Sequence, residues 1–115
     1  MSAAATISQA SIVRFHDFIR GQPCQHCGAV GATELAHYDA NRAGQFGKGM
    51  GKKAHWLMVM PLCGPGANRC HQKFDQSQVS TFEDQFMRKV DKSEMMLAYI
   101  ALTHIAAVEE GVLSL

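Results

Sequence analysis

The spacing of four cysteines constrains the fold of this chain more than any other feature of its sequence. The cysteines occur as Cys24-x2-Cys27 and, after a long gap, as Cys63-x6-Cys70. Glycine and proline residues flank the first pair and fill the second, which favours tight turns at both. Zinc is held by four soft ligands in a tetrahedron, and paired cysteines in tight turns supply two ligands each. The pattern therefore predicts a pair of zinc knuckles that joins two distant parts of the chain.

Two alternatives remain open for the second pair, because its spacing is wider than usual. Cys63 and Cys70 can be buried thiols that bind no metal. His71 can also replace Cys70 as the fourth ligand. The CxxC upstream and the turn residues between Cys63 and Cys70 favour a zinc site made of all four cysteines.

The length and composition fit one cytoplasmic domain that spans residues 1–115. The N-terminal residues lack the basic and apolar segments of a signal peptide. The longest apolar run, from Met95 to Val108, is shorter than the roughly 20 residues that a membrane crossing needs. We therefore expect no membrane partner and a reducing compartment, in which cysteines are metal ligands more often than disulfides.

The periodicity of apolar residues predicts a mixed α and β domain. We expect a helix over 8–20, capped by Ser8 or Ser11, and strands over 32–39 and 55–63. The glycine-rich stretch 41–53 between them is expected to be a loop. Cys70 is expected to begin a short helix, which completes a core over about residues 24–76.

Two further helices are predicted in the tail, over residues 81–110. Thr81 would cap the first, with Phe82, Phe86 and Val90 on one stripe, and Ser93 would cap the second. The second is apolar nearly all round, so it either lies in the core or forms a homodimer interface.

Several histidines stand in positions that suit a second metal. His71 and Asp75 are four residues apart, so on a helix both can reach one ion. His37 lies at the end of the first predicted strand, where it can meet them. A neutral imidazole beside a metal-bound phosphate can deprotonate a water molecule, which is the minimum equipment for cutting a phosphodiester.

The remaining histidines and the tryptophan have plainer interpretations. His16 and His104 lie on predicted helices and are expected to be structural. His26, inside the first knuckle, is expected at the surface. Trp56 is expected to anchor the core, and His55 is either a support for the base or a loop residue.

The charges are distributed unevenly along the chain. Every charged residue from 40 to 74 is basic, whereas acidic residues dominate from Asp75 onward. A basic segment beside metal-ligand motifs favours a nucleic-acid partner. The candidate DNA-binding residues are Arg42, Lys48, Lys52, Lys53, Arg69 and Lys73.

The segments "LAHYD", "GKGMGKKAHWLMVMPLC" and "RCHQKFD" resemble the HNH, or ββα-metal, endonuclease superfamily, in particular its small phage and prophage nucleases. This resemblance implies a ββα-metal core with His37 as the general base. It implies that His71 and Asp75 bind a catalytic Mg²⁺ or another divalent ion, and that the four cysteines hold structural Zn²⁺. Asp39 and His55 would substitute for a metal ligand and for the middle residue of the family motif.

We therefore expect an α+β domain with a ββα-metal (HNH) core and a four-cysteine zinc knuckle pair, flanked by N- and C-terminal helices. The favoured function is a metal-dependent DNA endonuclease from a phage, a prophage or a bacterial host. The alternative is a non-catalytic zinc module that binds DNA or a protein, dimeric through its last helix.

Overall fold

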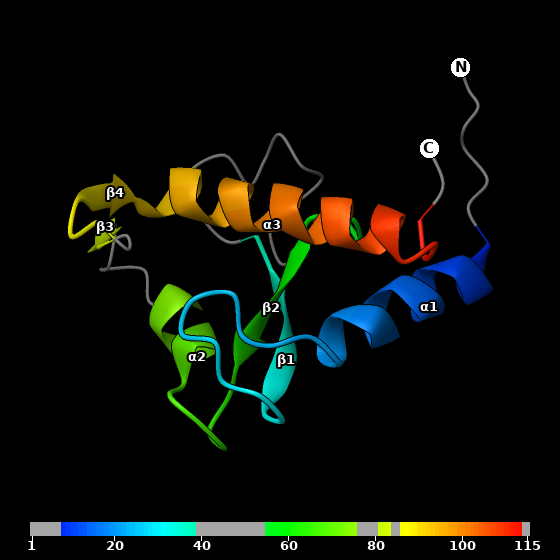
Figure 1. Cartoon of the computed structure of the whole chain (residues 1–115), viewed down its shortest axis with the longest axis horizontal. Helices are drawn as coiled ribbons and strands as arrows, with labels where there is room; N and C mark the ends of the chain where they lie inside the picture. Colours follow the sequence, from blue (N-terminus) through cyan, green and yellow to red (C-terminus); the bar gives the residue numbers. More distant parts are fainter. Residues whose placement is uncertain (1–7, 39–54, 76–80, 84–85, 114–115) are drawn as a thin grey trace.

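The computed structural model describes residues 8–38, 55–75, 81–83 and 86–113. Within these ranges the chain forms a small mixed α/β domain with three helices and two antiparallel two-stranded sheets (Figure 1). The elements in chain order are α1 (Gln9–Arg20), β1 (Thr33–His37), β2 (Val59–Cys63), α2 (Cys70–Asp75), β3 (Thr81–Glu83), β4 (Lys89–Asp91) and α3 (Lys92–Glu109).

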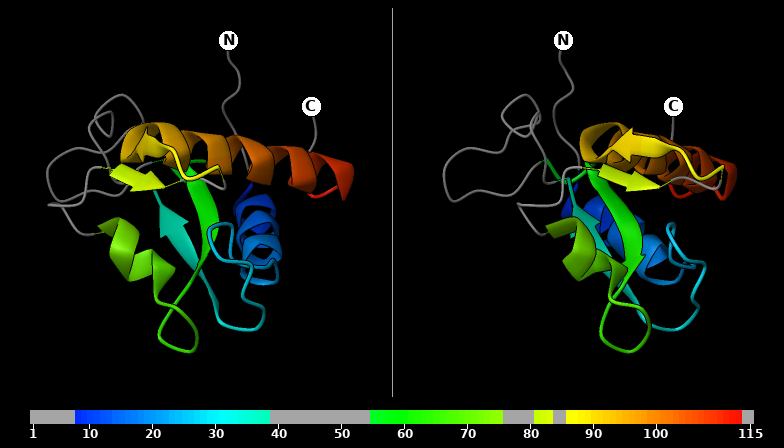
Figure 2. Two further views of the ribbon diagram at one scale, coloured as in Figure 1. Left: turned by 60° about the vertical axis from the view of Figure 1, so that its left-hand side comes forward. Right: turned by 90° about the vertical axis from the view of Figure 1, so that its left-hand side faces the viewer.

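The strands β1 and β2 pair in a register that joins Thr33 to Cys63 and His37 to Val59. Side chains alternate between the two faces of a strand, so each face of this hairpin has its own neighbours. The helices α2 and α1 lie on opposite sides of the hairpin, and α3 runs across one end of it (Figure 2).

The hydrophobic core is divided between these two faces. The first cluster lies toward α2 and the N-terminal half of α3, and its fully buried members include Tyr38, Met60, Leu62, Phe74 and Met96. The second cluster lies toward α1 and consists of Phe15, Ile19, Val59 and Ala107. Because α3 contributes to both clusters, it ties the two sides of the hairpin together.

The first helix agrees with the sequence prediction. The side chain of Ser8 accepts a hydrogen bond from the backbone N–H of Ser11, which caps α1. Phe15 and Ile19 are the buried residues of α1, and Gly21 is its C-cap. Ser8 is therefore the cap, and Ser11 is the residue that it caps.

The predicted helix over 81–90 is wrong. Thr81–Glu83 and Lys89–Asp91 form an antiparallel pair in which Phe82 faces Val90 directly. Met87 has a φ of 64°, which no right-handed helix accepts. Phe82 and Val90 share a face in either arrangement, so their spacing did not distinguish a helical stripe from a cross-strand pair.

The last helix forms as predicted, but it begins at Lys92 and its cap is Asp91, not Ser93. The carboxylate of Asp91 accepts the backbone N–H of Ser93 at 3.0 Å. The Ser93 hydroxyl is instead buried and hydrogen-bonded to the Tyr38 hydroxyl at 2.6 Å. The Ser93 side chain therefore packs in the core, and Asp91 caps the helix.

The helix α3 buries one face in the core and exposes another. Leu102 and Ile105 are 54% and 55% exposed, whereas Ile100 and Thr103 are buried. The core interpretation of this apolar helix is confirmed for the buried face. The homodimer stays a prediction, and its interface would be the exposed face of α3.

The second predicted strand is shorter than expected. Residues 55–58 form a turn before β2, closed by the backbone N–H of Met58 donating to the carbonyl of His55. Tyr38 continues the pairing by donating its N–H to the Met58 carbonyl. In the described part of the chain, no helix has both the length and the apolarity for a membrane crossing.

Candidate metal centre

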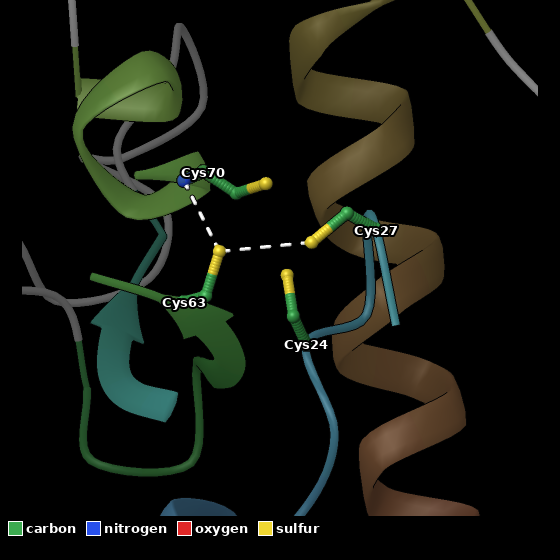
Figure 3. Close-up of side chains that lie close together, drawn as sticks. All are labelled: Cys24, Cys27, Cys63 and Cys70. Atoms are coloured by element: carbon green, nitrogen blue, oxygen red, sulfur yellow. Dashed lines mark hydrogen bonds between the residues drawn. The ribbon is translucent and has the colours of Figure 1, made fainter. Parts of the chain in front are cut away.

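The four cysteines converge on one point, although they come from distant parts of the sequence (Figure 3). Their sulfur atoms all lie within 4.8 Å of one another. The Sγ atoms of Cys27 and Cys63 are 3.7 Å apart. A zinc–sulfur distance of about 2.3 Å places neighbouring sulfurs of a tetrahedron about 3.8 Å apart. The cluster can therefore hold a metal ion such as zinc, and the predicted ligand set is confirmed as a group.

Backbone hydrogen bonds shape the first pair into a tight knuckle. The N–H of Gly28 donates to the carbonyl of Cys24, and the N–H of Cys24 donates to the carbonyl of Ala29, both at 2.9 Å. Gly28 has a φ of 81°, a conformation that glycine adopts without strain. The N–H of Gln25 donates to the carbonyl of Pro61, which fixes the knuckle against β2.

The second pair joins the end of β2 to the start of α2. Cys63 is the last residue of β2, and Cys70 is the first residue of α2. Between them, the backbone N–H groups of Ala67 and Arg69 both donate to the carbonyl of Gly64. The wide x6 spacing is thus the length of a turn that reverses the chain and brings Cys70 back to Cys63.

The four thiols differ in their surroundings. Cys24, Cys63 and Cys70 are buried, whereas Cys27 is exposed. A hydrogen bond from the side chain of Asn68, helped by the backbone of Ala29, lowers the pKa of Cys27 to about 6. Burial raises the pKa of the Cys70 thiol. Metal binding requires thiolates, so Cys27 is the ligand whose charged form the protein itself already favours.

A second cluster of polar side chains begins one residue after Cys70. The imidazole of His71 contacts a carboxylate on each side: Nδ1 lies 2.8 Å from Glu34 Oε1, and Nε2 lies 3.4 Å from Asp75 Oδ2. The side chains of Glu34 and Asp75 are 46% and 50% exposed, and that of His71 is 22% exposed. We call Glu34, His71 and Asp75 the outer cluster, and the four cysteines the thiol cluster. Cys70, not His71, therefore belongs to the thiol cluster.

The two carboxylates of the outer cluster contact opposite nitrogens of one ring, so the three side chains do not converge. Accordingly, the four cysteines are the one group of three or more ligands, among the residues described, that could share an ion. His71 Nε2 and Asp75 can still share a cation as a pair, with further ligands from solvent or a substrate.

The alternation of β1 directs His37 away from this pair. Ala36 and Tyr38 belong to the first hydrophobic cluster, and Leu35 packs against the second. His37 has the parity of Leu35, which places it toward α1, whereas Glu34 has the parity of Ala36. The structure therefore brings Glu34, rather than His37, against His71.

His55 and Trp56 have local structural contacts. Nδ1 of His55 accepts the backbone N–H of Leu57 at 3.2 Å within the turn. The ring of Trp56 packs edge-on against Phe15 in the second cluster, as its predicted role in the core requires.

His16 and His104 fasten helices to this same turn. Nε2 of His16 lies 3.0 Å from the carbonyl oxygen of Trp56, and Nε2 of His104 lies 2.6 Å from that of Leu57. Both histidines are therefore structural, as the sequence predicted.

His26 is half-buried, and thus more enclosed than the prediction of a surface histidine. Its Nδ1 lies 3.0 Å from the Tyr99 hydroxyl, and its ring packs edge-on against Phe74 and Phe82. Burial, together with the charge of Lys73, lowers the pKa of His26.

Two of the predicted DNA-binding residues are exposed: Arg69, just before α2, and Lys73, within it. The others lie outside the described residues, as does the candidate ligand Asp39; these are Arg42, Lys48, Lys52 and Lys53.

Sequence reasoning missed Glu34 and Asn68. Glu34 lies 37 positions from its partner His71, and no local pattern marks such a contact. Asn68 directly precedes the Arg69–Cys70 step, and an amide beside a cysteine pair is a signal for a hydrogen bond to sulfur. Comparisons of the chain with family models, with curated proteins and with solved structures found no match.

Proposed function

We propose that this protein is a zinc-stabilised, metal-dependent endonuclease that hydrolyses phosphodiester bonds in DNA. The observation that carries the proposal is the position of His71 and Asp75. Nε2 of His71 and Oδ2 of Asp75 lie 3.4 Å apart on the solvent-facing side of α2. His71 directly follows Cys70, a member of the thiol cluster. A helix that is fixed at its first residue by the thiol cluster, and that presents a nitrogen and a carboxylate to solvent, supplies an open site for a divalent ion.

The chemistry assigned to each part follows from its ligands. The sulfur cluster suits structural Zn²⁺, because four cysteines leave no open position for a substrate. The pair His71 and Asp75 suits Mg²⁺ or another divalent ion, which would supply an activated water and stabilise the charge that develops on the phosphate. By resemblance, His37 would be the general base, with His55 in support, although the alternation of β1 places His37 on the strand face opposite Glu34.

The partner is proposed to be DNA because two exposed cations lie on α2 and directly before it. Arg69 precedes α2 and Lys73 lies within it, both exposed. Cations of this kind bind phosphate without reading base sequence, so little sequence preference is expected.

A non-catalytic zinc module that binds DNA is the second candidate. The alternation of β1 favours it, because His37 and Glu34 lie on opposite faces of the strand. A general base must reach the water held by the metal, directly or through one further water molecule.

Nicking of supercoiled plasmid by the full chain, with Mg²⁺ or Mn²⁺ present, tests the proposal. The wild type is expected to cut, and His71→Ala is expected to abolish cutting while zinc content and fold are unchanged. His37→Ala tests the base in the same assay. Salt-sensitive DNA binding by a wild type that never cuts would favour the second candidate, and binding of neither kind would contradict both.

A further inference from the structure

The closest charged contact of the outer cluster joins β1 to α2. Oε1 of Glu34 lies 2.8 Å from Nδ1 of His71, a distance typical of a charge-assisted hydrogen bond. Neither the cysteine pattern nor the family resemblance assigns Glu34 a role. The contact fixes one side of the imidazole ring and leaves the other side facing Asp75.

The backbone of the thiol cluster is shaped around this carboxylate. A β-carbon added at Gly64, directly after Cys63, would overlap the carboxylate atoms of Glu34. The N–H of Gly64 donates to the carbonyl of Ala32 at 2.9 Å, so the turn is held close to β1. Here the turn that carries a zinc ligand also leaves the space that Glu34 occupies.

The contact determines which nitrogen of His71 is available. A neutral imidazole has one N–H, and when Nδ1–H donates to Glu34 the lone pair lies on Nε2. That lone pair then faces Asp75 Oδ2 at 3.4 Å, and two acceptors at this distance repel each other unless a proton or a metal cation lies between them. Two donors bound to one ion at about 2.1 Å and at right angles lie about 3 Å apart. The spacing of Nε2 and Oδ2 therefore suits a shared divalent cation.

We infer that Glu34 is a positioning residue: it holds His71 in the Nδ1–H tautomer and orients the ring so that Nε2 and Asp75 bind one divalent cation. Metal-ligating histidines are commonly held in this way by a carboxylate that accepts the other N–H. The inference rests on the proposed function, because it concerns the same divalent ion.

Two measurements on the zinc-loaded full chain test the inference. Long-range ¹H–¹⁵N NMR of labelled histidine reports the tautomer of His71, with His71→Ala to assign its signals. Calorimetric titration with Mn²⁺ reports binding at the outer cluster. The variants are Glu34→Ala, Glu34→Gln, and Glu109→Gln as a control for the lost charge, since Glu109 is exposed at the far end of α3.

Glu34→Ala is expected to mix the tautomers of His71 and to weaken Mn²⁺ binding about 10- to 100-fold, with zinc content unchanged. Glu34→Gln keeps an acceptor oxygen and should recover part of both signals, whereas Glu109→Gln should match the wild type. Gly64→Ala should reproduce Glu34→Ala by displacing the carboxylate, which gives a second route if Glu34→Ala folds poorly. A wild-type tautomer and wild-type Mn²⁺ affinity in Glu34→Ala would overturn the inference.

The two measurements also separate this inference from the proposed function. If the wild type cuts no DNA but Mn²⁺ binds and depends on Glu34, the endonuclease fails and the positioning role stands. If the wild type cuts DNA and Glu34→Ala changes neither tautomer nor Mn²⁺ affinity, the endonuclease stands and the positioning role fails. A wild type that binds no Mn²⁺ overturns the shared cation in both.

Discussion

The thiol cluster and the outer cluster adjoin at the Cys70–His71 peptide bond, yet they are built in opposite ways. The thiol cluster draws ligands from three segments into one point, and three of its four members are buried. The outer cluster is a line of a carboxylate, an imidazole and a second carboxylate, all at least partly exposed. The first is a closed group of four ligands, typical of a structural zinc site, and the second is open to solvent.

The comparison also explains how one short helix can serve both. The N-terminal residue of α2 faces inward to the other cysteines, and the next residue faces the solvent-exposed end of β1. Successive helical residues are about 100° apart around the axis, so neighbours in sequence belong to different environments. If the two clusters are energetically independent, a substitution in one should leave metal binding at the other unchanged.

The largest effect is expected from Cys63→Ser, which removes a buried thiol of the thiol cluster. Structural zinc contributes an apparent ~10–16 kcal/mol in small domains, as much as the whole stability of a typical fold. The variant should lose its zinc and its cooperative unfolding transition, as measured by metal analysis and circular dichroism. His71→Ala is the matched control and should keep both. A folded Cys63→Ser variant that retains a full equivalent of zinc would contradict the assignment of zinc to the four cysteines.

A smaller effect is expected where α2 is fastened to α3. Lys92 is buried, and its ammonium donates to the Phe74 carbonyl in the last turn of α2 at 2.6 Å. Lys92→Met keeps the aliphatic stem but leaves that carbonyl without its cation, which should lower the free energy of unfolding by about 1–3 kcal/mol. Urea unfolding measures the loss, and Lys89→Met, at an exposed lysine of β4, is the control.

The same Lys92→Met variant also tests whether the two clusters are independent, because Phe74 adjoins Asp75 at the end of α2 that is distant from Cys70. Binding of Mn²⁺ should weaken while zinc content is unchanged. Equal loss of both metals would show that α2 moves as one unit and that the two clusters are coupled.

The sequence predicted the thiol cluster well and the outer cluster only in part. Cysteine pairs with turn residues have few other uses, so Cys24, Cys27, Cys63 and Cys70 could be grouped without any fold. The His71–Asp75 contact followed from helical spacing alone. Glu34 could not be found, because its contact depends on the register of β1 against β2 and on the space that Gly64 leaves.

The errors in the tail have a related cause. Phe82 and Val90 fit a helical stripe and a cross-strand pair equally well, and short β strands leave only weak local signals. His26 is half-buried rather than at the surface, because its imidazole contacts Tyr99, Phe74 and Phe82 from later parts of the chain. Both are consequences of tertiary contacts that local patterns do not contain.

A moderate effect on zinc alone is expected from Asn68→Ala. The side chain of Asn68 donates to Cys27 Sγ at 3.3 Å and is the largest cause of the lowered pKa of that thiol. Without it the pKa of Cys27 should rise, and zinc affinity at neutral pH should fall about tenfold, or ~1.4 kcal/mol. Competition with a chromophoric chelator measures the affinity. Gln72→Ala, at an exposed position of α2, should leave it unchanged, and Mn²⁺ binding should be equal in both variants.

The smallest effect is expected from His55→Ala, which decides between two interpretations of this residue. His55 is exposed, and its Nδ1 accepts the Leu57 N–H in a turn that the Met58 N–H also closes. Loss of one exposed contact should change the free energy of unfolding by less than about 0.5 kcal/mol. If His55 only shapes the turn, plasmid nicking by His55→Ala should match that of the wild type. If it supports a base, nicking should fall together with that of His37→Ala while stability is unchanged. Such a paired loss would place the activated water near the α1 face of the hairpin, away from His71 and Asp75.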